Sequence, residues 1–177
     1  MRFTKGLAIG QVFIYVLVAL TFSVIMIFGY KSITEFVQRG EEVQFYQFKT
    51  DLESSIQRIY TEYKSVREST FYVPARYTRI CFVDVSKDPD DRLQAEDPLA
   101  FNAWKTVNAD ATTRSLDSYN IATENVFLTP PASDKIKVHQ ISIASSVPSA
   151  PGFLCKEIKN GAFTLTLEGK GDKTELS

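Results

Sequence analysis

The chain has few of the residues on which most metal and acid–base chemistry depends. Its 177 residues include one histidine, two cysteines and one tryptophan. A single His with two Cys cannot supply the usual four ligands of zinc, and no CxxC motif occurs. His139 lies in an expected strand with no nucleophile identifiable beside it, which favours a surface imidazole over a general base. We therefore expect no enzyme activity, no catalytic residue, no metal and no cofactor.

The chain also lacks any strong excess of charge of one sign. It has 20 Lys plus Arg against 21 Asp plus Glu, a formal net charge of −1. Nucleic-acid binding normally needs a concentrated basic stripe, so we expect no nucleic-acid partner. Lys31, Arg39 and Lys49 are dispersed among acidic residues, so no basic cluster for anionic lipid follows the N-terminal segment either.

Neither a charged residue nor a proline occurs between Leu7 and Tyr30. As a helix, these 24 residues would span about 36 Å, which exceeds the ~30 Å hydrocarbon core of a bilayer. Arg2 and Lys5 precede the run, and no acidic residue occurs before Glu35. The pattern predicts a basic leader over 1–6 and a single transmembrane helix over 7–30, with the lipid bilayer as a partner.

Two other structures for this run are less consistent with the sequence. A cleaved secretory signal would have a shorter apolar core and a small-residue cleavage site, and Ile27 to Lys31 offers no such site. A buried helix of a soluble core would show a polar face, and none interrupts the run. Both considerations favour a membrane anchor.

Apolar residues continue at helical spacing beyond the anchor, and no proline occurs before Pro74. They recur in steps of three or four at Phe45, Phe48, Leu52, Ile56, Ile59, Tyr63 and Val66. This spacing predicts an amphipathic helix over 31–68 that continues into the domain and packs on the domain's own sheet. A coiled-coil seam through Phe45, Leu52, Ile59 and Val66 is the alternative, but Ser55 and Glu62 occupy the intervening seam positions.

Residues 69–177 read as the β-rich part of the same domain. We expect a central strand over 79–85, a short helix starting at Asp97-Pro98, a loop over 108–118, and strands over 125–129 and 135–144. Asn160-Gly161 separates two strand-like runs, 153–159 and 162–168, and such a pair is the strongest short hairpin signal. The fold class is α+β, a long N-terminal helix packed on an antiparallel sheet.

One face of the last strand-like run is apolar, with Phe163, Leu165 and Leu167 alternating with polar residues. We expect these three side chains to cover the helix face that bears Leu52, Ile56, Ile59 and Tyr63. Cys81 and Cys155 lie in separate apolar segments, so an oxidising exterior would allow one disulfide between them. Two buried free thiols are the alternative.

Two further patterns are weak binding signals. Asp84, Asp88, Asp90 and Asp91 could offer oxygen ligands to Ca²⁺, but the glycine and distal glutamate of an EF-hand loop are absent, which favours a solvated turn. The segment 169–173 has two glycines and a lysine but no helix after it, so a phosphate loop is not expected. No N-x-S/T sequon occurs to indicate which side of the membrane is outside.

Lys5-Gly6 followed at once by an apolar helix resembles the leader junction of type IV prepilins and of the archaeal pilin-like proteins with a class III signal peptide. The resemblance covers residues 2–68 by motif and the rest by shape. It implies cleavage between Gly6 and Leu7 by a prepilin peptidase, and helix-mediated assembly into a homo-oligomer or filament. Pilins typically carry Glu at the fifth mature position, where this chain has Gln11.

Two functions follow from the sequence. The first is a pilin-like or pseudopilin-like surface subunit in the cell membrane, with its N-terminus cytoplasmic and its C-terminal domain extracytoplasmic. The second is a monomeric, membrane-tethered binding domain whose ligand is unknown. A membrane-bound enzyme is a distant third because no residues supply its chemistry.

Overall fold

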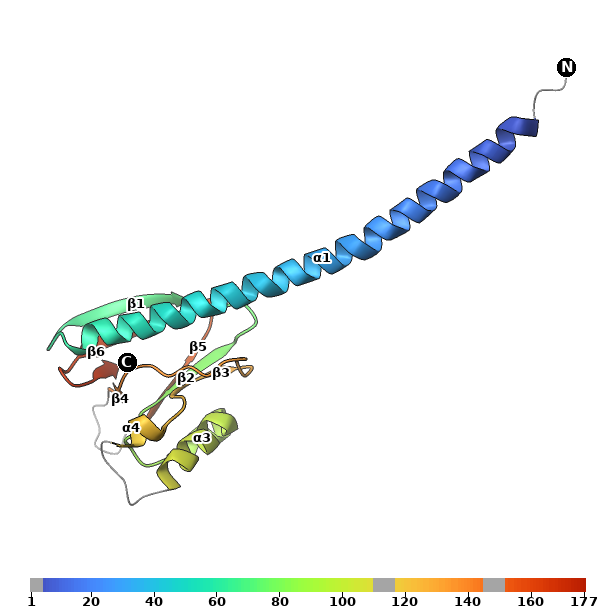
Figure 1. Cartoon of the computed structure of the whole chain (residues 1–177). Coiled ribbons are helices and arrows are strands. Elements are labelled where there is room, and N and C mark those ends of the chain that lie inside the picture. The colour runs from blue at the N-terminus through green and yellow to red at the C-terminus, as the bar shows by residue number, and fades with distance from the viewer. Residues whose placement is uncertain (1–4, 110–116, 145–151) are drawn as a thin grey trace. The chain divides into compact units, whose positions relative to one another are not determined.

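The computed structural model describes residues 5–109, 117–144 and 152–177 (Figure 1). The chain divides into two compact units, Met1–Val43 and Gln44–Ser177. Helix α1 (Lys5–Tyr60) contributes its first part to one unit and its second part to the other. The mixture of a long N-terminal helix and mainly antiparallel sheets confirms the predicted α+β class.

The second unit contains three further helices and seven strands among its described residues. The helices are α2 (Arg92–Glu96), α3 (Pro98–Ala109) and α4 (Asp117–Ile121). The strands are β1 (Val66–Tyr72), β2 (Arg79–Val83), β3 (Val126–Thr129), β4 (Ile141–Ile143), β5 (Phe153–Glu157), β6 (Ala162–Gly169) and β7 (Thr174–Leu176).

The strands form two sheets. Sheet A has the order β1-β6-β7-β4, and sheet B has the order β3-β2-β5. All pairings are antiparallel except that of β4 with β7, which is parallel. The predicted antiparallel pairing is therefore present everywhere in the two sheets except at this one pair.

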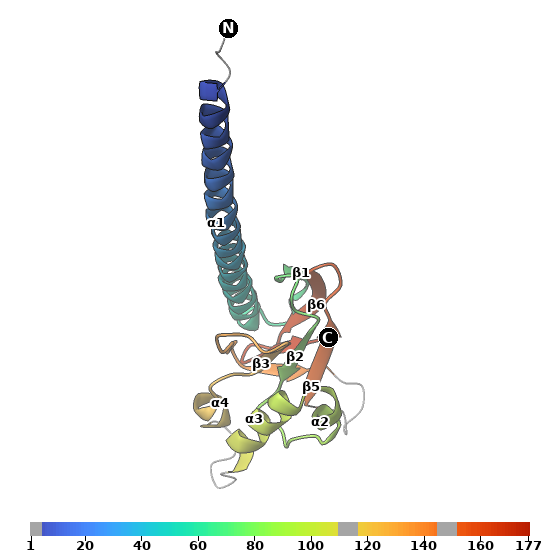
Figure 2. The ribbon, with the colours of Figure 1, turned by 90° about the vertical axis from the view of Figure 1, so that its right-hand side faces the viewer.

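Within the second unit sheet B lies between the end of α1 on one side and α2, α3 and α4 on the other (Figure 2). The first core, between α1 and the strands, includes Phe48, Leu52, Ile80, Phe82 and Leu165. The second core, on the side of the short helices, includes Cys81, Val83, Leu93, Trp104 and Phe153. Sheet B therefore buries apolar side chains on both faces, whereas the strands of sheet A contribute to the first core alone.

This arrangement explains the composition of β2. Ile80 and Phe82 point into the first core, while Cys81 and Val83 point into the second. Successive side chains of a strand face opposite sides, so a strand between two cores must be apolar at every position. The prediction of a central strand is confirmed, with β2 between β3 and β5, although the strand ends at Val83 and not at residue 85 as expected.

The helix stripe packs on the domain's own strands, as predicted. Leu52 and Ile56 are fully buried and Ile59 is 1% exposed, in the same core as Phe163, Leu165 and Leu167. The rings of Phe48 and Phe163 lie 6.1 Å apart in an edge-to-face arrangement. Because the domain covers this face, it is not free to form a coiled-coil seam with another helix.

The predicted end of the long helix was wrong. Helix α1 ends at Tyr60 rather than near residue 68, and Val66 begins a strand. Tyr63 lies in the intervening turn and is 68% exposed, so it does not belong to the buried stripe. Lys64 has a φ of 63°, and this left-handed conformation cannot continue a right-handed helix.

The predicted turn at Asn160-Gly161 is present, but the long hairpin is not. Asn160 and Gly161 have φ angles of 54° and 70°, as a type I′ turn requires. Only Lys159 and Ala162 pair across the turn. Strand β5 pairs with β2 and β6 pairs with β1, so the two strands that flank the turn belong to different sheets.

Cys81 and Cys155 form a disulfide, as predicted. The two residues are directly opposite each other on β2 and β5, with their Cα atoms 4.0 Å apart. Cys81 is fully buried and Cys155 is partly exposed. The bridge joins segments that are 74 residues apart in the sequence, so it ties the first strand of sheet B to the last.

Other local expectations were partly met. Asp97 caps α3 through its carboxylate, which accepts hydrogen bonds of 3.0 Å from the amides of Leu99 and Ala100. The expected strand over 135–144 is reduced to β4 (Ile141–Ile143) and an isolated bridge at Ile136. Of the loop expected over 108–118, residues 110–116 lie outside the described ranges, and Asp117 begins α4.

We expect Ile59→Ala to lower the free energy of unfolding by about 3 kcal/mol, within the usual range of roughly 2–5 kcal/mol for such truncations. The reason is the cavity left between α1 and β6 in the first core. Val66→Ala is the matched control, because Val66 is 61% exposed and should change stability by less than about 0.5 kcal/mol. Guanidinium unfolding followed by the fluorescence of Trp104, which is 1% exposed, measures both. A similar loss at both positions would contradict the burial of Ile59 in the first core.

Candidate functional site

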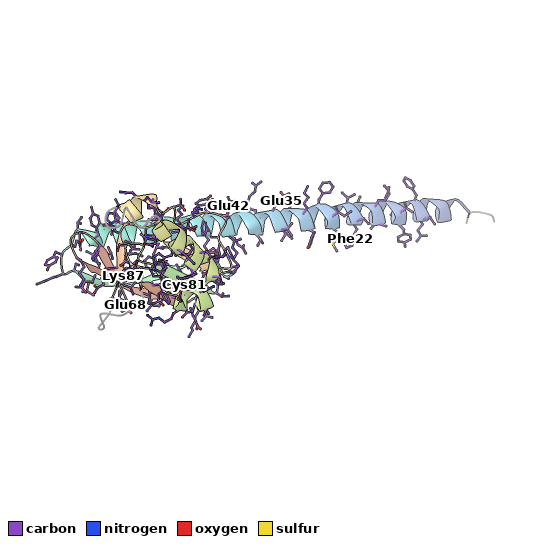
Figure 3. The ribbon with its side chains drawn as sticks, turned by 90° about the horizontal axis from the view of Figure 1, so that it is seen from below. Phe22, Glu35, Glu42, Glu68, Cys81 and Lys87 are labelled. Carbon is purple, nitrogen blue, oxygen red and sulfur yellow. A yellow bond between two sulfur atoms is a disulfide. The ribbon has the colours of Figure 1, made fainter. Side chains whose placement is uncertain are left out.

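The first candidate site is the apolar part of α1, described here within its own unit. It is the one helix in the described part of the chain that is long and apolar enough to cross a membrane. From Val12 to Tyr30 its large apolar side chains are all exposed, from 45% at Leu17 to 75% at Tyr30. Figure 3 shows Phe22 projecting from this part of the helix. An exposed apolar surface that continues around a helix is stable in lipid rather than in water.

Hydroxyl groups in the same segment are satisfied by the helix itself. Thr21 Oγ1 donates to the carbonyl oxygens of Leu17 and Val18, each at 3.0 Å. Ser23 Oγ donates to the carbonyl oxygen of Ala19 at 2.8 Å. Because lipid tails cannot accept hydrogen bonds, such back-bonding is what polar side chains in a membrane span require.

The processing residues Lys5, Gly6 and Leu7 lie at the start of α1. The predicted leader 1–6 falls partly outside the described residues. Gln11 lies one turn further along, and its Nε2 is 3.5 Å from the hydroxyl oxygen of Tyr15, a long contact. Along the sequence, the next residue with a formal charge after Lys5 is Lys31.

His139 is not in a strand, contrary to the sequence-based expectation. Its ring stacks on Tyr60 with the centroids 4.0 Å apart, and it lies 6.0 Å from the ring of Tyr119. Its Nδ1 atom is buried without a hydrogen-bond partner. With aromatic rings as these neighbours in the described residues, the imidazole has the surroundings of a packing residue.

The aspartates after β2 make local contacts. Asp84 accepts hydrogen bonds from the amide of Ser86 at 3.1 Å and from its hydroxyl at 2.5 Å. Arg92 donates to both carboxylate oxygens of Asp90, and this hydrogen bonding holds the pKa of Asp90 below its ordinary value. Across the described ranges, no group of three or more His, Cys, Asp or Glu residues could hold a metal ion.

The glycine-containing segment 169–173 connects β6 to β7. The ammonium group of Lys170 lies 2.7 Å from Glu168 and 3.2 Å from Glu175. The hydrogen bond to Glu168, followed by that to Glu175, raises the pKa of Lys170. Because Lys170 forms ion pairs with two carboxylates of sheet A, its ammonium group stabilises the sheet and is not placed as a phosphate ligand.

A second candidate site lies in the second unit, between α1 and β1. It is a groove of about 390 Å³ with Phe48 and Phe71 among its lining residues. Its other walls are the polar side chains of α1 and β1, namely Asp51, Ser54, Ser55, Arg58, Ser69, Thr70 and Tyr72. Sequence reasoning missed it, because it depends on the unexpected strand β1.

Comparisons of the chain with protein-family models, with curated proteins and with solved structures found no match. The function must therefore be argued from the residues of this chain.

Proposed function

We propose that the chain is a pilin-like or pseudopilin-like surface subunit, a structural protein held in the cell membrane by the first part of α1. The observation that carries the proposal is the segment from Gly10 to Tyr30, which exposes apolar side chains all round and bonds its hydroxyls internally. The Lys5-Gly6 junction before this segment, with its likeness to prepilins, supports the pilin-like assignment.

The proposed orientation keeps Arg2 and Lys5 in the cytoplasm and exports the second unit. The positive-inside rule favours this orientation only weakly, because Lys31 and Arg39 follow the span. The Cys81–Cys155 disulfide supports it further, since disulfides persist mainly on the oxidising side of a membrane.

The proposed partners are the lipid bilayer, a prepilin peptidase that cuts between Gly6 and Leu7, and other copies that assemble through the N-terminal helix. Cleavage would make Gln11 the fifth mature residue, about one helical turn from the new amine. A glutamine there can accept a hydrogen bond but brings no charge to offset that amine. The proposal includes no catalytic role and no nucleic-acid partner.

The second proposed function is a monomeric, membrane-tethered binding domain. Two observations favour it: Gln11 replaces the expected glutamate, and the second unit carries a groove beside α1. In this case the leader stays attached and the helix acts only as an anchor.

We expect Gly6→Leu to block processing, because a bulky side chain would obstruct the peptidase at the bond after residue 6. The measurement is N-terminal sequencing of the membrane-bound chain from cells with and without a prepilin peptidase. The native chain should begin at Leu7 only when the peptidase is present, and the Gly6→Leu chain should keep its leader in both.

Gln11→Glu is a matched variant that tests assembly, as Gly6→Leu tests processing. It should be processed like the native chain and should assemble as well or better, because a carboxylate can offset the amine of a neighbouring subunit. Electron microscopy of sheared surface material measures assembly. An intact leader on the native chain in the presence of active peptidase would contradict the pilin-like proposal and leave the tethered domain.

A further inference from the structure

The groove between α1 and β1 has a free strand edge along one side. Strand β1 is the first strand of sheet A and, within the described part of the chain, pairs with β6 alone. In Figure 1, β1 runs alongside the second part of α1. Since α1 and β1 are connected by a short turn and run in opposite directions, Arg58 lies toward the start of β1 and Asp51 toward its end.

The register shows which backbone groups of β1 face outward. Val73 N–H donates to the carbonyl oxygen of Gly161 at 2.8 Å, and Gly169 N–H donates to that of Ser65 at 2.9 Å. In an antiparallel ladder these bonds recur at every second residue, so the odd-numbered residues of β1 bond to β6. The N–H and C=O groups of the even-numbered residues therefore point away from the sheet, at Val66, Glu68, Thr70 and Tyr72.

The wall formed by α1 carries two opposite charges without ion-pair partners among the described residues. Asp51 and Arg58 are both exposed, both line the groove, and lie about 10 Å apart along the helix axis. Ser54 and Ser55 lie between them and offer hydroxyl groups. A free strand edge thus faces a helix wall with a carboxylate near one end and a guanidinium near the other.

We propose that this groove binds an extended peptide segment of another protein, which adds to sheet A as a strand antiparallel to β1. Backbone hydrogen bonds to β1 would hold the segment, as in other cases of strand addition. Its side chains facing α1 would include a basic residue near Asp51 and an acidic residue about four positions later near Arg58, a spacing of about 13 Å in a strand. The proposal rests on the second unit alone and does not depend on whether the leader is cleaved.

The test uses the full chain in lipid nanodiscs that hold one copy each. The probes are two fluorescently labelled peptides with blocked ends, Thr-Lys-Val-Thr-Val-Glu-Thr and the charge-exchanged Thr-Glu-Val-Thr-Val-Lys-Thr. They have the same composition and the same net charge. Fluorescence anisotropy should show the first peptide binding at least fivefold more tightly than the second. Binding of neither peptide, or equal binding of both, would overturn the proposal.

A charge exchange in the groove gives the reciprocal test. The double variant Asp51→Lys with Arg58→Glu should reverse the preference and bind the second peptide more tightly. Both positions are exposed, so the thermal unfolding of the domain should change little. An unreversed preference in this folded variant would show that the peptides bind elsewhere.

Variants of Thr70 test whether the outward backbone groups of β1 bind the peptide. Thr70→Pro removes an outward N–H that the β1–β6 ladder does not use, and an edge strand tolerates proline at such a position. It should weaken binding of the first peptide at least tenfold, while Thr70→Val, which keeps the N–H, should bind it as the native chain does. If β1 instead becomes protected from amide exchange only when two copies share a nanodisc, the edge pairs with a second copy and the proposal is wrong.

Discussion

Gly169→Ala should lower the free energy of unfolding of the second unit by about 4 kcal/mol. A Cβ atom at this position would lie 2.2 Å from the carbonyl oxygens of both Ile59 and Glu62. Neither oxygen belongs to a flexible side chain, so the last turn of α1 or the end of β6 would have to shift. Such overpacking against backbone is among the few single changes with large effects.

The shift would also weaken the hydrogen bonds that join α1 to sheet A. Lys64 N–H donates to the carbonyl oxygen of Gly169 at 2.8 Å, and Gly171 N–H donates to that of Tyr60 at 2.9 Å. Each such bond contributes about 1 kcal/mol, which together with the strain gives the expected total. Guanidinium unfolding followed by Trp104 fluorescence measures the change.

Gly40→Ala is the matched control for Gly169→Ala. A Cβ atom at Gly40 would meet nothing within 4 Å, and alanine is favoured over glycine inside a helix. This variant should be neutral or slightly more stable than the native chain. A loss below about 1 kcal/mol for Gly169→Ala would mean that α1 and β6 are not in close backbone contact.

Removal of the disulfide should have a comparable effect. The double variant Cys81→Ala with Cys155→Ala should be destabilised by about 4 kcal/mol, since the bridge closes a loop between residues 74 apart and restricts the unfolded chain. Alanine is chosen because Cys81 is fully buried and a serine hydroxyl there would need a partner. The measurement is guanidinium unfolding with and without a thiol reductant.

The reductant provides the control. It should lower the unfolding midpoint of the native chain toward that of the double variant and leave the double variant unchanged. A midpoint for the native chain that does not respond to complete reduction, verified by thiol labelling, would contradict the expectation.

Several features could be predicted from the sequence because they depend on local pattern. The uncharged run of Leu7 to Tyr30 predicts a helix of membrane-spanning length whatever follows it. The spacing of Phe45, Leu52 and Ile59 predicts a buried helix face, and these residues are at most 1% exposed. Asn160 and Gly161 predict a tight turn because both tolerate positive φ.

Only the tertiary structure decided where the long helix ends and which strands pair. The apolar spacing continues through Tyr63 and Val66, so helical periodicity gives no stop signal at Tyr60. In the structure, the backbone groups of Gly169 and Gly171 hydrogen-bond Lys64 and Tyr60 at the end of the helix, from more than 100 residues away. A turn motif likewise specifies only the residues that it joins, whereas strand pairing depends on the competition among all available edges.

The sequence by itself therefore determined the helix of membrane-spanning length, the buried helix face, the turn and the α+β class, since each arises from residues close together in the chain. The tertiary structure decided that β1 exists, that β5 and β6 separate into two sheets, and that Cys81 lies opposite Cys155. The groove beside α1 is also a feature that only the tertiary structure decided, because a strand edge is left free only once the pairing of the whole sheet is fixed. These features depend on contacts between segments that are distant in the sequence. The free energies of such contacts cannot be read from the local spacing of residues.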